Sequence, residues 1–289
     1  MLLLDGKVVR KNIAKTLEEN FKKFSRRATL AIVQIGDLAP SNAYIKQKKL
    51  FGESIGVVVK HLKLLADSLE SDIVGEIQKL NTDESVQGII VQLPLPKNIN
   101  ISNVLNSVNK DKDVDGLTAT NFRKLAEGVS GYFIPATARG VCELLEYYKV
   151  PIAGERVVVV GRSMLVGKPT ALALLLRGAT VTITHSQTKN LAEVTRLADI
   201  LIVAIGKPRF ITDEYVSQNQ VVVDVGINDI SGEKFDEEIP KRHLVGDIDF
   251  DSVKNTVRAL SPVPGGVGPM TVLALFENLF DVCRKSQKS

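Results

Sequence analysis

The sequence predicts an α/β protein with two domains, the second of a nucleotide-binding type. Two observations lead to this prediction. The chain has 289 residues, which is too long for one ordinary domain. Apolar, strand-like runs alternate with helix-like stretches, and this alternation restarts after Pro151. Such alternation is typical of parallel sheets that are covered on both faces. We therefore expect a first domain over residues 1–138, completed by a C-terminal helix over 270–289, and a second domain over 139–269.

The first half of the chain predicts helices and strands in turn. Ile13, Leu17, Phe21 and Phe24 recur at helical spacing, and β-branched and apolar runs indicate the strands. The expected elements are a helix at 10–24, a strand at 30–35, a helix at 42–56 with Ser41 as its N-cap, a strand at 57–64, a helix at 71–81 and a strand at 88–93. Residues 110–120 and 128–131 are expected to be loops.

The second half repeats the alternation with clearer strands, which favours a dinucleotide-binding sheet. The expected elements are a helix at 139–148, strands at 156–160, 180–184, 200–204 and 220–225, helices at 169–177 and 190–197, and an amphipathic helix at 270–285. We expect this last helix to pack back on the first domain.

Composition excludes several classes of function. With 37 basic and 33 acidic residues, the net charge is +4, and the chain has no Trp, so nucleic acid is not an expected partner. The densest basic cluster, at residues 22–27, is interpreted as a solvated helix face. No apolar run is long enough for a membrane span, and the charged N-terminus does not resemble a secretion signal.

Cysteine and histidine usage argues against disulfides and metals. Cys142 and Cys283 are far apart, which favours a reduced, cytoplasmic location. The three histidines, His61, His185 and His243, have no metal-ligand spacing, so we expect isolated histidines and no metal site.

A cofactor site is predicted after the first strand of the second domain. Gly161 follows the apolar run 157–160, and Pro169 opens the next helix, so backbone N–H groups can face a pyrophosphate. The turn departs from G-x-G-x-x-G because Arg162 and Ser163 replace a glycine, and structural closure alone is the alternative. The next strand ends in residues 185–189 without a carboxylate, which favours NADP over NAD, although a polar loop without a ligand remains the alternative.

Polar side chains of the first domain form a candidate chemical site. Tyr44 and Lys48 lie four apart on one predicted helix and so share a face. Gln92 ends a buried strand, where its amide needs a partner such as a lysine amine. Asp113 and Asp115 lie in a loop at the mouth of the same sheet. An exposed lysine face and an ordinary Asx turn are the structural alternatives.

Longer motifs then carry a resemblance to a known family. They are Ser41-x-x-Tyr44-x-x-x-Lys48, the run Val91-Gln92-Leu93-Pro94-Leu95-Pro96, the run Asp111-Lys112-Asp113-Val114-Asp115-Gly116, Gly161-Arg162-Ser163 with Val166-Gly167-Lys168-Pro169, and the stretch from Pro262 to Thr271 that contains Pro-Gly-Gly-Val-Gly-Pro. In this order they resemble the bifunctional methylenetetrahydrofolate dehydrogenase/methenyltetrahydrofolate cyclohydrolase family, from Leu4 to the last helix.

The resemblance implies two α/β domains flanking a cleft, with a reduced folate on the first, NADP on a Rossmann-type second domain, and a homodimer. It implies catalytic roles for Lys48, Tyr44, Gln92 and Asp115. The implied substrate-binding residues are Tyr44, Gln92, Leu93, Pro94, Asp115, Pro264, Gly265, Gly266, Gly268 and Thr271. The implied cofactor-binding residues are Gly161, Arg162, Ser163, Val166, Gly167, Pro169, His185, Ser186, Gly206 and Ile227.

The implied chemistry fits these residues. The carbon to be oxidised lies between two nitrogens whose lone pairs expel a hydride, so positioning is most of the first task. Hydrolysis of the methenyl cation needs proton transfer, which suits a lysine whose pKa is lowered by burial. A monofunctional NAD(P)-dependent dehydrogenase and a non-catalytic folate-binding protein are the alternatives.

The sequence departs from the family pattern in four places. Pro135-Ala136-Thr137-Ala138 stands where Pro-Cys-Thr-Pro is usual, and Leu50 replaces a basic residue. Phe122 replaces the glycine that usually follows the asparagine, and Met164 replaces an asparagine beside the expected pyrophosphate. None of these changes removes a proposed catalytic residue.

Overall fold

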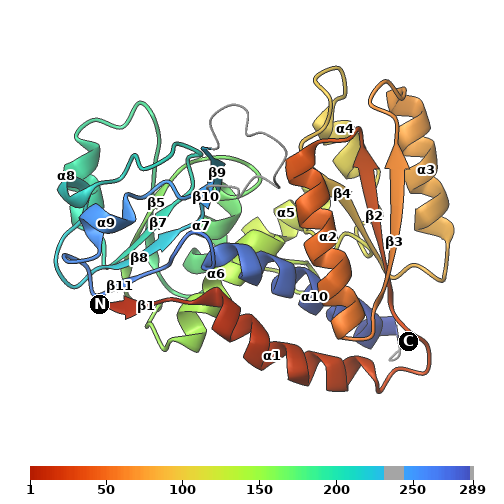
Figure 1. The fold of residues 1–289 in the computed structure, drawn as a ribbon, viewed down its shortest axis with the longest axis horizontal. Helices are drawn as coiled ribbons and strands as arrows, with labels where there is room; N and C mark the ends of the chain where they lie inside the picture. Colours follow the sequence, from red (N-terminus) through yellow and green to blue (C-terminus); the bar gives the residue numbers. More distant parts are fainter. Residues whose placement is uncertain (231–243, 287–289) are drawn as a thin grey trace, which may run out of the picture. The chain divides into compact units, whose positions relative to one another are not determined.

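The computed structural model describes residues 1–230 and 244–286 (Figure 1). The chain divides into two compact units. The six-stranded unit comprises Met1–Arg10 and Thr137–Thr271, and the three-stranded unit comprises Lys11–Ala136 and Val272–Ser289. Both sheets are parallel, so the predicted α/β class with two parallel sheets is confirmed.

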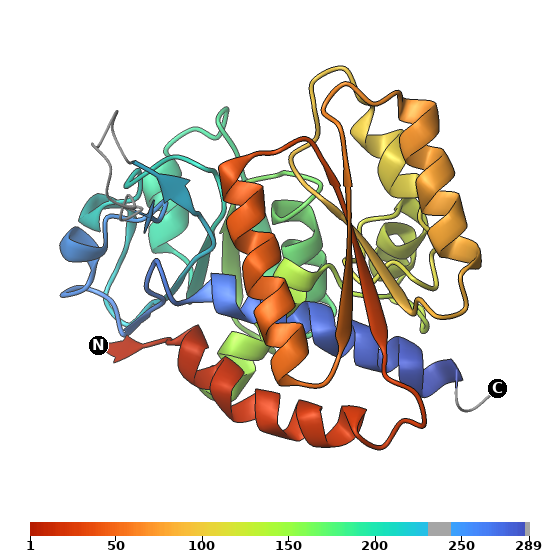
Figure 2. The same ribbon diagram turned by 45° about the vertical axis from the view of Figure 1, so that its right-hand side comes forward.

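The three-stranded unit has the strand order β3-β2-β4. These strands are β2 (Thr29–Ile35), β3 (Val58–Leu64) and β4 (Gly88–Gln92). Its helices are most of α1 (Gly6–Phe21), then α2 (Ala39–Ser54), α3 (Glu70–Thr82), α4 (Ile101–Asn106) and α5 (Ala119–Glu127). Figure 2 shows this sheet close to edge-on, with α2 on one side and α3 on the other.

Alternation along the strands assigns each residue to one face of this sheet. Ala31, Val33 and Ile35 of β2 pack in one buried cluster with Ile73 and Ile77 of α3. The intervening residues of β2, which end with Gln34, therefore point to the face that α2 covers.

The C-terminal helix α10 (Val267–Ser286) crosses the boundary between the units at Val272. Within the three-stranded unit, the Asn278 side chain donates from Nδ2 to the backbone oxygens of Val114, at 2.8 Å, and Ile134, at 3.0 Å. The Phe276 ring meets Phe51 of α2 edge to face, with 5.4 Å between ring centroids. This helix therefore completes the core beneath α2.

The six-stranded unit has the order β1-β11-β8-β7-β5-β6. Its strands are β1 (Leu2–Leu3), β5 (Arg156–Val160), β6 (Thr180–Thr184), β7 (Ile200–Val203), β8 (Val221–Asp224) and β11 (Ala259–Leu260). Its helices are α6 (Ala136–Tyr147), α7 (Gly167–Leu175), α8 (Leu191–Arg196), the 3-10 turn Asp213–Tyr215 and α9 (Phe250–Val253). The strands β9 (Asn228–Asp229) and β10 (Leu244–Val245) form a separate antiparallel ribbon.

The order of this sheet places a topological switch point at β5. The chain passes from β5 to β6 on one side and then returns to β7 on the other side of β5. Ligands of open α/β sheets bind outside the carboxyl ends of the strands at such a point. Gly161 directly follows β5 and therefore lies at this position.

Three expectations from the sequence need correction. Residues 1–10 were assigned to the first domain, but β1 pairs in parallel with β11, so they belong to the six-stranded unit. Ser41 is not an N-cap, because α2 begins at Ala39 after Leu38. Residues 110–120 are expected as a loop, but α5 begins at Ala119 with Thr118 as its cap, whereas residues 128–131 lie outside helices and strands as expected. Within the described residues, none of the helices is both long and apolar enough to cross a membrane.

Candidate functional site

Lys48 and Gln92 meet in the three-stranded unit. Lys48 Nζ on α2 donates to Gln92 Oε1 at the end of β4, at 3.0 Å. The other end of this amide, Nε2, donates to the backbone oxygen of Leu93 at 2.8 Å. Ser41 donates to the same oxygen at 3.5 Å. Because its nitrogen is occupied, Gln92 can present only its oxygen to the lysine, as expected for a buried amide that needs a partner.

Lys48 shares its surroundings with Asp115. Burial lowers the pKa of the Lys48 ammonium, and the negative charge of Asp115 opposes this shift. Burial likewise raises the pKa of the Asp115 carboxyl, which Lys48 lowers again and Asp113 raises further. Both side chains are partly buried. A lysine whose pKa is lowered gives up its proton more readily than an exposed lysine, which is the property that acid/base catalysis requires.

Asp113 organises the loop that carries Asp115. Its carboxylate, 3% exposed, accepts hydrogen bonds from the backbone N–H groups of Leu117, at 3.1 Å, and Thr118, at 2.9 Å. Asn121 Nδ2 adds a third bond at 2.8 Å. Asp113 is therefore fully engaged inside the loop, which leaves Asp115 as the carboxylate available to a ligand.

Tyr44 lies one turn before Lys48 on α2 and is partly buried. Leu93 is partly buried and Pro94 is exposed, directly after β4. All six residues of this group, Tyr44, Lys48, Gln92, Leu93, Pro94 and Asp115, thus come from one unit.

The expected cofactor residues are in the six-stranded unit, at the carboxyl end of β5. Gly161 has φ +129°, and a Cβ there would lie 2.2 Å from the backbone oxygen of Ala204. A Cβ on Gly167 would lie 2.2 Å from the oxygen of Gly161. Only glycines allow this close approach of the turn, the neighbouring strand and α7. Ser163 Oγ accepts the backbone N–H groups of Val166, at 3.2 Å, and Gly167, at 3.3 Å, and so fixes the entry to α7.

A second turn follows β6. The backbone N–H of His185 donates to Thr188 Oγ1 at 2.9 Å, and His185 Nδ1 accepts from the N–H of Gln187 at 3.2 Å. Ser186 of this turn and Arg162 of the turn after β5 are exposed. The two turns therefore offer hydroxyl and basic groups to a ligand, and the sequence 185–189 contains no carboxylate.

Two buried aspartates, which sequence reasoning did not identify, hold the loop that contains Gly206. The Asp247 carboxylate accepts from three consecutive backbone N–H groups, those of Ile205 at 2.7 Å, Gly206 at 2.9 Å and Lys207 at 2.8 Å. Asn228 Nδ2 donates to the same carboxylate at 2.9 Å. Asp224 gives a sequence signal as a carboxylate that ends the apolar strand β8, whereas Asp247 gives none.

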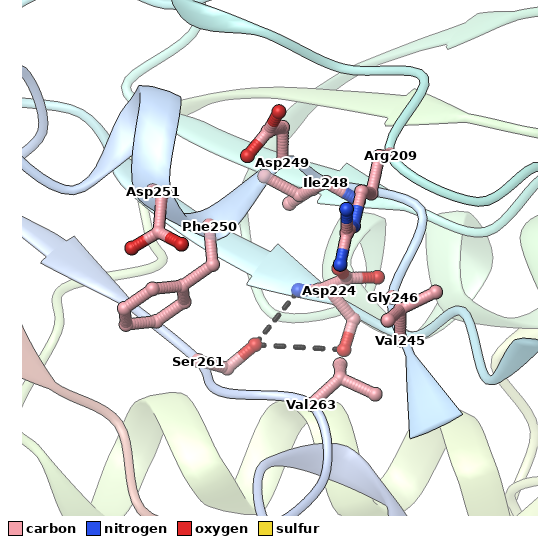
Figure 3. A pocket seen from close by; sticks show the side chains of 10 residues that line it. All are labelled: Arg209, Asp224, Val245, Gly246, Ile248, Asp249, Phe250, Asp251, Ser261 and Val263. Atoms are coloured by element: carbon pink, nitrogen blue, oxygen red, sulfur yellow. Dashed lines mark hydrogen bonds between the residues drawn. The ribbon is translucent and has the colours of Figure 1, made fainter. Parts of the chain in front are cut away.

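Asp224 borders a cavity of about 160 Å³ beside this loop (Figure 3). Its own backbone N–H donates to Ser261 Oγ at 2.7 Å, a bond that joins the ends of β8 and β11. Burial raises the pKa of Asp224 to about 7. The remaining lining residues are Arg209, Val245, Gly246, Ile248, Asp249, Phe250, Asp251 and Val263.

The glycine-rich loop before α10 also lies in the six-stranded unit. Gly265 accepts from the backbone N–H of Lys7 at 3.2 Å, and Gly266 donates to the oxygen of Pro262 at 2.7 Å. Thr271 Oγ1 donates to Thr137 Oγ1 at 3.4 Å. The expected substrate-binding residues Pro264, Gly265, Gly266, Gly268 and Thr271 therefore share a unit with the expected cofactor residues, including the exposed Ile227.

His61 lies in the strand β3, where its ring contacts Lys49 and Gln34. His185 lies in the turn after β6, and His243 lies outside the described residues. Over residues 1–230 and 244–286, no group of His, Cys, Asp and Glu side chains has the arrangement of a metal site.

Two models of one protein family match the chain, one on either side of residues 116–134. Residues 4–115 match the catalytic domain of tetrahydrofolate dehydrogenase/cyclohydrolase, and residues 135–287 match its NAD(P)-binding domain. The bifunctional protein FolD of Chlamydia trachomatis serovar L2 is 43% identical over 285 residues, which cover 97% of this chain and 98% of that protein.

Solved structures give the same result. The bifunctional FolD enzyme from Campylobacter jejuni has a TM-score of 0.93 at 37% identity and covers 99% of both chains. The Trypanosoma brucei enzyme, complexed with NADP cofactor and inhibitor, has a TM-score of 0.93 at 32% identity, with 100% of this chain and 99% of that one covered. Over nearly its whole length, the chain therefore belongs to the tetrahydrofolate dehydrogenase/cyclohydrolase family.

Proposed function

We propose that this chain oxidises methylenetetrahydrofolate to methenyltetrahydrofolate with NADP and then hydrolyses the product to formyltetrahydrofolate, as a bifunctional enzyme of one-carbon metabolism. The observation that carries this proposal is the 3.0 Å bond between Lys48 Nζ and Gln92 Oε1, beside Asp115. It supplies a lysine of lowered pKa in the domain that matches the family's catalytic domain.

The oxidation asks the protein mainly to position its reactants. The methylene carbon lies between two nitrogens, and their lone pairs stabilise the cation as a C–H bond breaks and the hydride leaves. NADP, when bound, accepts that hydride. No protein base is needed, so the contribution of this chain is to hold and orient the folate. We assign that task to Asp115, whose carboxylate can accept the N–H groups of the pterin ring, and to Tyr44.

The hydrolysis asks for a proton carrier. Water adds to the methenyl carbon and loses a proton, a C–N bond then breaks, and the departing nitrogen gains a proton. Lys48 in its neutral form accepts the first proton and, as the ammonium, returns one to the nitrogen. Gln92 accepts a hydrogen bond from one N–H of the lysine. This bond fixes the orientation of the amine and therefore of its lone pair and its other N–H bonds. Lys48 is partly buried, and this burial lowers the pKa of its ammonium, which makes the neutral amine easier to form than in an exposed lysine.

NADP rather than NAD fits the residues after β5 and β6. The glycine turn at Gly161 leaves no room for a Cβ, which suits close approach of a pyrophosphate to the backbone. A 2′-phosphate needs basic and hydroxyl groups, and Arg162 and Ser186 are both exposed there. The acidic residue that would bind the ribose hydroxyl of NAD is missing from the sequence 185–189.

One spectrophotometric assay tests the proposal. Methylenetetrahydrofolate is supplied with NADP or NAD while reduced cofactor and the methenyl species are followed. We expect reduction with NADP and decay of added methenyltetrahydrofolate above the buffer rate without cofactor. Accumulation of the methenyl species without enzymatic decay would indicate a monofunctional dehydrogenase, and folate binding without turnover would indicate a binding protein.

The homodimer and the cytoplasmic location remain predictions from the family resemblance and from cysteine usage. Light scattering in solution tests the first, because a dimer has twice the chain mass of 31.5 kDa.

A further inference from the structure

A row of polar side chains faces α2 from the three-stranded sheet. Gln34 of β2 is the register partner of Gln92 in β4 and of Lys63 in β3. Neighbouring residues in register on parallel strands point to the same face. His61 lies two residues before Lys63 on β3 and therefore points to this face as well. Gln34 is only 1% exposed, so its amide needs partners within the protein.

These side chains form one continuous chain of hydrogen bonds with α2. Lys49 Nζ lies 3.0 Å from His61 Nδ1, and His61 Nε2 lies 2.8 Å from Gln34 Oε1. Gln34 Nε2 donates to Asn42 Oδ1 at 2.8 Å. Asn42 Nδ2 donates to Asp37 Oδ1 at 2.7 Å, and Lys63 forms an ion pair with Asp37 at 2.9 Å.

The direction of every bond follows from the Asp37 end. An ionised Asp37 can only accept, so the Asn42 amide donates to it and turns its oxygen toward Gln34. Gln34 then donates to Asn42 and turns its own oxygen toward His61. His61 Nε2 must therefore carry the proton, and Nδ1 accepts from the Lys49 ammonium. This chain of bonds requires the neutral ring, because a charged His61 would direct an N–H at the ammonium.

The chain of hydrogen bonds contacts α2 on both sides of Tyr44 and Lys48. Asn42 precedes Tyr44 by two residues, and Lys49 directly follows Lys48. Asn42 is hydrogen-bonded to Gln34 directly, and Lys49 is linked to it through His61. Gln34 is in turn the register partner of Gln92, which accepts a hydrogen bond from Lys48. The sheet thus holds α2 on either side of Tyr44 and Lys48.

The geometry points to Gln34 and His61 as positioning residues, which set the place of Lys48 for hydrolysis only while His61 is neutral. This inference rests on the proposed function for the reaction that it affects. Protonation of His61 would replace the hydrogen bond between Lys49 and its ring with repulsion between two positive charges. The helix α2 would then lose one of its two attachments to the sheet.

The charges around His61 favour the neutral ring. Burial lowers its pKa most, followed by the positive charges of Lys49 on α2 and Lys63 on its own strand. From β2 it faces the neutral Gln34. The ring should therefore gain its proton at a lower pH than an ordinary histidine, whose pKa is about 6.5.

The test compares three variants with a matched control. His61→Gln keeps one acceptor and one donor without titrating, whereas His61→Phe and Gln34→Leu break the chain of bonds. Lys60→Gln is the control, because Lys60 precedes His61 on β3 but points to the other face and pairs with Asp83. Methenyl hydrolysis and hydride transfer are measured between pH 5.5 and 8.5, and thermal unfolding reports whether each variant is folded.

We expect His61→Phe and Gln34→Leu to lower kcat for hydrolysis about tenfold or more with little change in KM, because a displaced catalytic group loses rate rather than affinity. His61→Gln should stay within about twofold of the wild type at pH 8 and lack the loss of rate that the wild type shows as His61 becomes protonated. A pH profile of His61→Gln equal to that of the wild type across the pH at which the ring of His61 titrates by NMR, or full hydrolysis in folded Gln34→Leu, would overturn the inference.

An NMR titration separates this inference from the proposed function. The ring of His61 and the Nζ of Lys48 are followed in the full chain, without turnover. We expect the Lys48 signal to respond to His61 protonation in the wild type and not in His61→Gln. Absence of methenyl hydrolysis in the wild type would contradict the proposed function alone, whereas a Lys48 signal indifferent to His61 and to Gln34→Leu would overturn the positioning role.

Discussion

Asp224 Oδ1 accepts the backbone N–H of Asp247 at 3.0 Å, so one buried carboxylate fixes the residue whose own carboxylate holds the next loop. Asp224 also accepts from the N–H groups of Gly226 and Ile248. Asp247, which is fully buried, in turn gathers the three N–H groups at 205–207. The two aspartates therefore link the end of β8 to the Gly206 loop, which the family resemblance places at the cofactor.

Asp247→Asn should weaken the binding of NADP. The amide keeps one acceptor oxygen and turns an N–H₂ group toward backbone donors, and each buried donor left without a partner costs about 1–3 kcal/mol. We expect NADP affinity to fall about tenfold. The free energy of unfolding should fall by about 1–3 kcal/mol. Calorimetric titration with NADP measures the first. The control is Asp251→Asn, an exposed carboxylate paired with Lys254, and unchanged NADP affinity in Asp247→Asn would contradict the role of the loop.

Ionisation of Asp224 should make stability fall as pH rises. Its pKa is raised to about 7 by burial, whereas an unfolded aspartate ionises near pH 4. Between these values the folded state binds more protons than the unfolded state, so the free energy of unfolding decreases with increasing pH, by at most about 4 kcal/mol. Urea denaturation of the wild type and Asp224→Asn from pH 4.5 to 8 tests this. The free energy of unfolding of Asp224→Asn should increase relative to that of the wild type as pH rises. An equal dependence on pH in the two proteins would contradict the raised pKa.

The longer strands of the second sheet could be predicted because β5, β7 and β8 are buried apolar runs and the edge strand β6 is rich in β-branched residues. Arg156–Val160 and Thr180–Thr184 have the bounds that their β-branched runs indicate. β1 and β11 could not be predicted, since two residues show no periodicity. The helices α4 and α5 were missed because they are short and polar, and their starts depend on caps at Asn100 and Thr118.

Contacts of the site were predictable only where a single residue demanded a partner. Gln92 did so as an amide at the end of an apolar strand, and Lys48 lies within hydrogen-bond distance of it. His61 gave no such signal, and Gln34, an amide within the apolar run 30–35, demanded a partner without indicating which one. They are 27 residues apart, and only the parallel register of β2 and β3 makes them neighbours. Asp247 was hidden for a similar reason, because its partners are backbone N–H groups some 40 residues earlier.

The choice between NADP and NAD should depend on Arg162 and Ser186. Arg162→Ala removes a cation expected at the 2′-phosphate, and hydrogen bonds to charged groups contribute about 1.5–3 kcal/mol. We therefore expect KM for NADP to rise about tenfold or more while KM for NAD changes little. Ser186→Glu should reverse the preference, because its carboxylate repels a phosphate and accepts a ribose hydroxyl.

Initial rates with both cofactors measure this preference. Arg123→Ala is the matched control, since Arg123 is an exposed arginine paired with Glu127 in the other unit. Equal effects of Arg162→Ala on NADP and NAD would mean that Arg162 binds a part common to both cofactors.

Lys48→Met should separate the two activities. The variant keeps an unbranched side chain only one atom shorter but has no proton to exchange, so hydrolysis of methenyltetrahydrofolate should fall about 10²-fold to 10⁴-fold. Lys46→Met, an exposed lysine on the same helix, is the control and should keep both rates. In the wild type, hydrolysis should rise with pH as the neutral amine forms and level off below the usual lysine range, because burial lowers the pKa of Lys48.

Hydride transfer provides the decisive comparison for Lys48. This step needs no protein base, so Lys48→Met should keep dehydrogenase kcat within about tenfold, a loss that reflects only less exact positioning. Hydrolysis at the wild-type rate would exclude Lys48 as the proton carrier. Equal losses in both activities would show instead that Lys48 only holds the folate, since an acid/base group acts on one of the two reactions and a binding group acts on both.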